Sequence, residues 1–317
     1  MPGAVRKSLK SPDSGSNTCP VCRAIAKEHL PAVHDSISLK AFSIYRCASC
    51  GLGATQPKPK NLDAFYAVRY YGNRHWRTSH YCVWRRLRVV RLLSGRDRGR
   101  LLDVGCGDGQ FAAAARRAGW SVFGTELNDG GAVERRVPLY SSLEQATGAF
   151  QCITLWHVLE HMPDPLSTIR LLRSMIAPGG ALVLSVPNFS GWQARMFGKH
   201  WFHLDVPRHC HHFDAASLKV LLEAGGFSVV RRWHHELEYD WFGWIQSALN
   251  PFTSVPSVLF DGLTGKPRRV SKRELICSYL GAAVLAPITF LLTVMSTLVR
   301  SGGTIIVAAR PRPDHFV

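Results

Sequence analysis

Short apolar runs alternate with longer amphipathic ones through the central part of the chain. Residues 165–176 and 215–224 carry apolar side chains at helical spacing. Glycine-rich turns precede two of the later apolar runs. Strands are expected at residues 101–104, 121–126, 139–140, 152–155, 181–186, 227–230 and 304–309. Strands that alternate with helices predict an α/β fold with a doubly wound, mostly parallel sheet.

The first of these apolar runs ends in a glycine-rich turn with the sequence LLDVGCGDG. Gly105, Gly107 and Gly109 allow the backbone to approach a ligand closely. The N–H groups at the start of the following helix favour the negative or polar end of that ligand. Asp103 lies just before the turn. Glu126 ends the next run, about 20 positions further on, where a ribose diol is held in dinucleotide-binding folds. The pattern predicts a nucleotide-like cofactor.

The glycine spacing resembles motif I of the class I S-adenosylmethionine-dependent methyltransferases. The lysine-bearing phosphate loop of NTPases is absent. The resemblance implies a seven-stranded Rossmann-like sheet whose last strand, residues 304–309, runs antiparallel to the others. It also implies S-adenosylmethionine as the cofactor. The cofactor-binding residues it implies are Asp103, Gly105, Cys106, Gly107, Gly109, Glu126 and Trp156.

Two CxxC pairs, Cys19–Cys22 and Cys47–Cys50, are separated by 24 residues. Thiolates at this spacing can close a tetrahedral zinc site, and four of them leave no open position for catalysis. We therefore expect a structural zinc ribbon, with four unliganded cysteines as the alternative. The chain has nine cysteines, an odd number. This cysteine usage indicates a protein of a reducing compartment with a metal site, and it argues against a disulfide framework.

Residues 80–93 form a basic, amphipathic segment. The apolar positions predict a helix that covers the edge of the sheet. A solvated face is favoured for its arginines over a ligand site, although a basic patch with neighbouring arginines is the alternative. The arginines concerned are Arg85, Arg86, Arg88 and Arg91, with Arg69, Arg74 and Arg77 nearby.

Histidines cluster after the fourth and fifth predicted strands of the cofactor sheet. Residues 157–161 read HVLEH, a pattern also found in metallopeptidases, but their position after a strand favours the place where cofactor and acceptor meet. Residues 201–213 contain four more histidines. Imidazoles suit general-base work on an acceptor hydroxyl, and structural or metal-binding roles remain open. The candidate catalytic residues are His157, His161, His209 and His211.

Residues 241–260 and 275–299 contain no charged side chain. The second segment could span a bilayer, but residues 304–309 must return to the sheet, which excludes a single crossing. Two crossings would export a basic linker, against the positive-inside rule. Prolines 251, 256 and 287 are expected to break the helices. We expect an in-plane or re-entrant helical pair at the inner leaflet, with a buried cap or dimer interface as the alternative.

The 317 residues carry a formal charge of +17, and 46% of them are hydrophobic. Such an excess indicates an anionic partner: nucleic acid, an anionic lipid surface or a phosphorylated substrate. Residues 1–17 lack an apolar signal segment, which predicts a cytoplasmic protein at the inner membrane face. The expected units are a zinc-ribbon module (1–60), a methyltransferase core (61–240), an apolar insertion (241–300) and a last strand (301–317).

The cysteine pairs together with HVLEHMPDP, SVPN and PRHCHHF resemble a group of bacterial methyltransferases with a zinc-binding N-terminal segment. Relatives in that group act on sugars or glycan precursors. The resemblance implies methyl transfer to a hydroxyl or other nucleophile of a membrane-linked acceptor, such as a lipid, a lipid-linked saccharide or another small molecule. An RNA methyltransferase that uses the ribbon and the basic helix, and a non-catalytic scaffold, are the alternatives. The apolar insertion argues against RNA, and the intact glycine turn argues against the scaffold.

Overall fold

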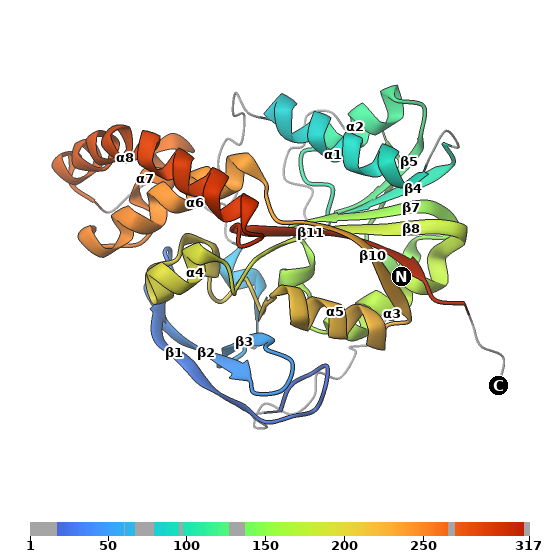
Figure 1. The fold of residues 1–317 in the computed structure, drawn as a ribbon, viewed down its shortest axis with the longest axis horizontal. Helices are drawn as coiled ribbons and strands as arrows, with labels where there is room; N and C mark the ends of the chain where they lie inside the picture. The colour runs from blue at the N-terminus through green and yellow to red at the C-terminus, as the bar shows by residue number, and fades with distance from the viewer. Residues whose placement is uncertain are drawn as a thin grey trace, which may run out of the picture.

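The computed structural model describes residues 18–59, 61–66, 79–94, 98–126, 137–265 and 270–313. Two sheets organise this part of the chain, and helices cover both faces of the larger one (Figure 1). The larger sheet has seven strands in the order β10-β11-β8-β7-β4-β5-β6. Its strands are β4 (Arg100–Val104), β5 (Ser121–Thr125), β6 (Leu139–Tyr140), β7 (Phe150–Trp156), β8 (Ile176–Pro187), β10 (Phe227–Trp233) and β11 (Thr304–Pro311).

The predicted doubly wound sheet and its antiparallel last strand are confirmed. β11 pairs antiparallel with both β8 and β10, whereas β4, β5, β6, β7 and β8 run parallel to one another. Parallel strands are buried on both faces, which is why they read as continuous apolar runs. In β4, Leu101 and Leu102 are both fully buried but belong to the cores on opposite sides of the sheet.

One face of the sheet is covered by α1 (Ser79–Ser94) and α2 (Gln110–Arg117), and the other by α3 (Pro165–Met175) and α5 (Ala215–Ala224) (Figure 1). Helix α1 was expected at the edge of the sheet, and this is wrong. Its Val89 and Val90 are buried with Val183 of β8 and Cys152 of β7, so it covers the middle of the face.

The smaller sheet joins the N-terminal segment to the core. Its strands are β1 (Ala26–His34), β2 (Ala41–Cys47), β3 (Gly53–Gln56) and β9 (His211–His212), and all pairs are antiparallel. Strand β9 comes from the histidine-rich segment after β8. A buried ion pair between Arg208 and Asp35, with 2.8 Å between Nη2 and Oδ1, strengthens this junction. The predicted unit limits stay predictions, but the sheet extends across the limit at residue 60.

The apolar insertion forms α6 (Leu237–Leu249), α7 (Val258–Leu263) and α8 (Lys272–Leu298). The expected breaks near Pro251 and Pro256 are confirmed, because α6 ends at Leu249 and α7 begins after both prolines. The expected break at Pro287 is wrong, since α8 continues through it. The remaining helices are α4 (Trp192–Phe197) and the short 3-10 helices Asp63–Phe65, Leu143–Gln145, Leu159–His161, Gly198–His200, Phe202–Leu204 and Asn250–Phe252.

Beyond its charged first turn, helix α8 has hydroxyl side chains inside and apolar side chains outside. Ser278, Thr289 and Thr293 are buried, and the indole of Trp241 on α6 donates a 3.2 Å hydrogen bond to the Thr289 hydroxyl. Leu280 and Val284, by contrast, are 63% and 71% exposed. A helix in water normally shows the opposite arrangement. Among the described helices, α8 is the one that is long and apolar enough to cross a membrane.

The arginines of α1 do not all form the expected solvated face. Arg85 and Arg86 turn toward the sheet and pair with the fully buried carboxylate of Glu236, which follows β10. Arg85 also contacts Glu238 at 3.3 Å. Arg88 of the same helix is exposed and lies over the ring of Trp84. The expectation is therefore wrong for Arg85 and Arg86, because a buried carboxylate about 150 residues away in sequence draws them inward.

We expect Arg85→Ala to lower the free energy of unfolding by about 3 kcal/mol, because it weakens the neutralisation of a buried carboxylate. Chemical denaturation checks this. Arg88→Ala on the same helix is the matched control and should change stability by less than about 0.5 kcal/mol. Equal effects of the two substitutions would contradict a special role for the buried pair.

Candidate active site

The glycine turn between β4 and α2 has the backbone conformation that its sequence predicts. Gly105, Gly107 and Gly109 have φ values of 66°, 56° and 75°, in the left-handed region that favours glycine. A Cβ atom on Gly105 would lie 2.6 Å from Cγ2 of Val158, so a larger residue does not fit there. A Cβ atom on Gly107 would have no neighbour within 4 Å. The turn is therefore packed on one side and open beside Gly107.

Two carboxylates flank this turn. Asp103 is buried behind it and accepts a 2.7 Å hydrogen bond from the hydroxyl of Thr154 on β7. Burial raises the pKa of Asp103 to about 7. Glu126 follows β5, and its Oε2 accepts a 2.8 Å hydrogen bond from the N–H of Gly107. Glu126 thus lies on the open side of the turn, where a ribose diol could reach it, whereas Asp103 connects the turn to the neighbouring strand.

The other two predicted cofactor residues lie beside the turn. The N–H of Cys106 donates to the carbonyl of Thr125 at 3.0 Å, and its thiol packs over Gly124. Trp156 ends β7 and is buried, with Phe111 edge-on at 5.5 Å and the Arg86 guanidinium 5.0 Å from its ring centre. The indole thus contributes to the core, and its contact with a cofactor stays a prediction.

His157 lies between two buried carboxylates directly after β7. Its Nε2 is 2.8 Å from Oε2 of Glu236, and its Nδ1 is 3.4 Å from Oε1 of Glu160. Burial alone would lower the pKa of His157, but these carboxylates outweigh it and raise the pKa to about 10. Its ring also stacks on Tyr239 with 4.4 Å between ring centres. His157 is therefore a partly buried cation near neutral pH.

His161 and His209 lie next to Glu160, with 4.6 Å between the two ring centres. Nδ1 of His161 lies 3.1 Å from the Arg208 carbonyl, and Nδ1 of His209 lies 2.9 Å from the His203 carbonyl. A carbonyl only accepts, so the His209 ring carries its proton on Nδ1 and keeps a lone pair on Nε2. Nδ1 of His161 faces both its carbonyl and a tyrosine hydroxyl, that of Tyr66, at 2.8 Å. Burial, and His209 nearby, lower the pKa of His161 to about 4.

The side chains of Glu160, His161 and His209 offer ligand atoms that all lie within 4.8 Å of one another. Both carboxylate oxygens of Glu160 are buried without a hydrogen-bond partner among the described residues. The cluster has the donor atoms either to accept a proton from an acceptor hydroxyl or to hold a metal ion.

His211, the fourth candidate base, lies apart from this cluster on β9. It is fully buried, and its Nδ1 lies 3.1 Å from the carbonyl of Met162. Burial lowers its pKa to about 3. Its neighbour His212 bonds to the Thr55 hydroxyl at 2.9 Å. The structure thus brings His157, His161 and His209 around Glu160 and places His211 in the small sheet; the catalytic roles stay predictions.

Sequence reasoning missed the acidic residues that follow β10. Glu236 contacts Arg85, Arg86 and His157, and it accepts a 2.8 Å hydrogen bond from the Ser185 hydroxyl on β8. A signal was present, because residues 234–240 read HHELEYD and concentrate three acidic residues in a chain of net charge +17. Tyr66, whose hydroxyl lies 2.8 Å from Nδ1 of His161, was also missed.

The four paired cysteines converge at one point. Two tight turns supply them, and all four Sγ atoms lie within 4.8 Å of one another. The shortest separations are 3.5 Å between Cys19 and Cys50 and 3.4 Å between Cys22 and Cys47. Disulfides require about 2.05 Å, whereas tetrahedral zinc with Zn–S bonds of about 2.3 Å separates sulfurs by about 3.8 Å. The arrangement fits a zinc ion better than two disulfides.

Comparison with known proteins agrees with this geometry. A family profile described as "Methyltransferase domain" matches residues 74–232, half of the chain. The ubiquinone biosynthesis O-methyltransferase of Xanthomonas axonopodis pv. citri (strain 306) is 33% identical over 202 residues, covering 58% of this chain and 75% of the relative. Its counterpart in Xanthomonas campestris pv. campestris (strain B100) is 27% identical over 201 residues, which again cover 58% of this chain and 75% of the relative.

Among solved structures, a SAM dependent methyltransferase from Archaeoglobus fulgidus shares 19% identity, with a TM-score of 0.44 over 73% of this chain and 93% of that one. The match to the family profile covers the glycine turn, Glu126 and the histidine cluster up to His211. The chain therefore belongs to the methyltransferase-domain family and is a class I S-adenosylmethionine-dependent methyltransferase.

Proposed function

We propose that this enzyme transfers a methyl group from S-adenosylmethionine to a hydroxyl of an amphipathic acceptor at the inner face of a bacterial cytoplasmic membrane. The observation that carries the proposal is α8, whose polar side chains face α6 and whose apolar side chains face outward. Only 11% of its most apolar stretch is buried. The relatives named O-methyltransferases support oxygen as the methylated atom. The acceptor class, a lipid or a lipid-linked saccharide, is part of the proposal.

The residues around the glycine turn fit this cofactor. Glu126 would accept hydrogen bonds from the ribose hydroxyls, and the open space beside Gly107 would admit the nucleoside. When bound, S-adenosylmethionine supplies an electrophilic methyl carbon on a sulfonium. The turn therefore orients the cofactor, while the chemistry at the acceptor depends on the histidine cluster.

Methyl transfer to oxygen is an in-line displacement that needs alignment and removal of the hydroxyl proton. Nε2 of His209 can accept that proton, because its Nδ1 is bonded to a backbone carbonyl, and the neighbouring His161 is the second candidate base. Glu160 would then stabilise the imidazolium that forms. His157 already carries a proton, so we assign it a positioning role: it holds Glu160 and Glu236 in place.

The alternative of an RNA methyltransferase gains no support from the helix that suggested it. Arg85 and Arg86 of α1 are engaged with the buried carboxylate of Glu236 and are not available for phosphates.

The partner we propose is an anionic lipid surface. Lys272 and Arg273 at the start of α8 are exposed and could contact it. Lys266, Arg268 and Arg269 of the predicted basic linker lie outside the described residues.

Binding of S-adenosylhomocysteine should depend on Glu126. Glu126→Ala removes the acceptor for the ribose hydroxyls, so we expect affinity to fall about tenfold or more. Isothermal titration calorimetry measures this. Glu144→Ala, at an exposed acidic position on a 3-10 helix, is the control and should leave affinity unchanged. An unchanged affinity in Glu126→Ala would refute the role of this carboxylate.

With methyl-labelled S-adenosylmethionine and bacterial membranes, label should enter a product that extracts into organic solvent. A variant with Leu280→Glu, Val284→Glu and Leu291→Glu should lose vesicle binding and this transfer, because charges on the exposed face of α8 oppose insertion. It should still bind S-adenosylhomocysteine. Val230→Glu, at an exposed position on β10, is the control. Label found only in RNA or in water-soluble products would contradict the proposed acceptor.

We further propose that Cys19, Cys22, Cys47 and Cys50 hold one structural zinc ion. Metal analysis of purified protein should find about one zinc per chain, and Cys22→Ser should lower that content and loosen the small sheet. Cys277→Ser, at an exposed cysteine on α8, is the control and should keep the metal. A folded, active and metal-free preparation would overturn the assignment.

A further inference from the structure

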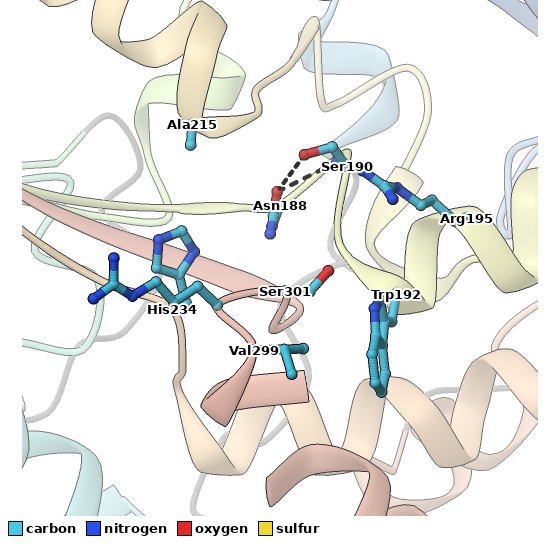
Figure 2. A pocket seen from close by; sticks show the side chains of 9 residues that line it. Asn188, Ser190, Trp192, Arg195, Ala215, His234, Val299 and Ser301 are labelled. Carbon is cyan, nitrogen blue, oxygen red and sulfur yellow. Dashed lines mark hydrogen bonds between the residues drawn. The ribbon is translucent and has the colours of Figure 1, made fainter. Parts of the chain in front are cut away.

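A polar pocket lies apart from the histidine cluster, where β8 and α8 end. Its volume is about 370 Å³. Figure 2 shows side chains from the end of β8, from α4, from the connection between β10 and α6, and from the end of α8 around this space. It is lined by Asn188, Ser190, Trp192, Arg195, Ala215, His234, Val299, Arg300 and Ser301. None of the predicted cofactor, catalytic or zinc residues is among them.

The lining of this pocket is basic. Arg195 and Arg300 contribute two guanidinium groups, His234 contributes an imidazole, and no acidic side chain lines it. Within the described part of the chain, neither arginine forms an ion pair, whereas Arg85, Arg86 and Arg208 are all paired with carboxylates. Two guanidinium groups without a counter-charge at one pocket produce a positive potential that an anion would neutralise.

His234 adds an unsatisfied polar group to the wall of the pocket, because its Nδ1 is buried and has no hydrogen-bond partner among the described residues. Arg300 is the residue at which the backbone leaves α8. Its φ of 57° is the left-handed conformation of a helix C-terminus, where the N–H of Arg300 donates to the carbonyl of Thr297 and the N–H of Ser301 donates to the carbonyl of Ser296. The end of the helix therefore holds Arg300 at the pocket.

The chemistry of the lining favours phosphate over carboxylate. A guanidinium group binds two phosphate oxygens at once, and the hydroxyl of Ser301 adds a further donor. A carboxylate has two oxygens and one charge, which would leave several of these donors unused. The pocket also has an apolar rim, because Trp192 and Val299 line it. Leu298 and Met295 continue this apolar surface along α8, where they are exposed.

We propose that this pocket binds the phosphate group of an amphipathic phosphate monoester or diphosphate, whose apolar chain lies along the exposed side of α8. The pocket lies at the C-terminal end of α8, the helix that is proposed to contact the membrane. An anionic group held there would lie at the level of the lipid headgroups. This site is separate from the cofactor turn, so its occupancy does not depend on the identity of the methyl acceptor.

Calorimetry with inorganic pyrophosphate tests the pocket directly. We expect binding to the full-length protein, and a loss of affinity of about tenfold or more in Arg195→Gln and in Arg300→Gln, since each removes a charge-assisted hydrogen bond. Arg170→Gln, at an exposed position on α3, makes the same charge change elsewhere and should have no effect. No binding by the wild type, or an equal loss in Arg170→Gln, would overturn the site.

Vesicles distinguish a lipid phosphate from a free one. Phosphatidylcholine vesicles are doped with phosphatidic acid or with phosphatidylserine to the same zeta potential. We expect preferential binding to phosphatidic acid, lost in Arg300→Gln and competed by pyrophosphate. Pyrophosphate binding without this preference would overturn the amphipathic ligand. S-adenosylhomocysteine binding, retained in every variant, reports on folding and on the methyltransferase site independently.

Discussion

The buried carboxylate of Glu236 is the constraint on which the carboxyl edge of the sheet depends. A charge with no exposed surface is tolerated in a protein interior only when opposite charges and donors surround it. Arg85 and Arg86 come from α1, His157 from the end of β7, and Ser185 from β8. One side chain therefore fixes a helix and two strands, and it does so directly before α6 begins.

From this carboxylate, alternating charges extend to the candidate bases. Glu236 holds His157 as a cation, and His157 in turn faces Glu160, which lies beside His161 and His209. His209 is also fixed from the other side. The hydroxyl of Thr55 on β3 donates a 2.6 Å hydrogen bond to the His209 carbonyl. The small sheet of the N-terminal segment thus helps to position a residue of the candidate active site, which gives that segment a role beyond its own folding.

Features set by local pattern were predictable from the sequence, and features set by distant contacts were not. The glycine turn, the strands and the convergence of the cysteines depend on residues close in the chain or on regular spacing. The inward position of Arg85 depends on Glu236, 151 residues away. A row of arginines on an amphipathic helix is typical of a solvated face. Only knowledge of a buried acid on the covered side of α1 could have corrected this prediction. Likewise, His211 belongs to β9 and pairs with Ala54 of β3. A pairing between segments so distant in the chain is not visible in the sequence around His211.

The insertion between β10 and β11 connects these constraints to the exposed apolar side of α8. Its first helix, α6, begins right after Glu236 and contains Asp240, which accepts the N–H of Glu236 at 3.2 Å. Helix α8 packs on α6 through buried hydroxyls, so its apolar side must face outward. The orientation of that side relative to the histidine cluster is therefore set by hydrogen bonds and ion pairs within the protein. A lipid surface that covers α8 would meet the enzyme in one fixed orientation, with the basic pocket of Arg195 and Arg300 at the end of the same helix.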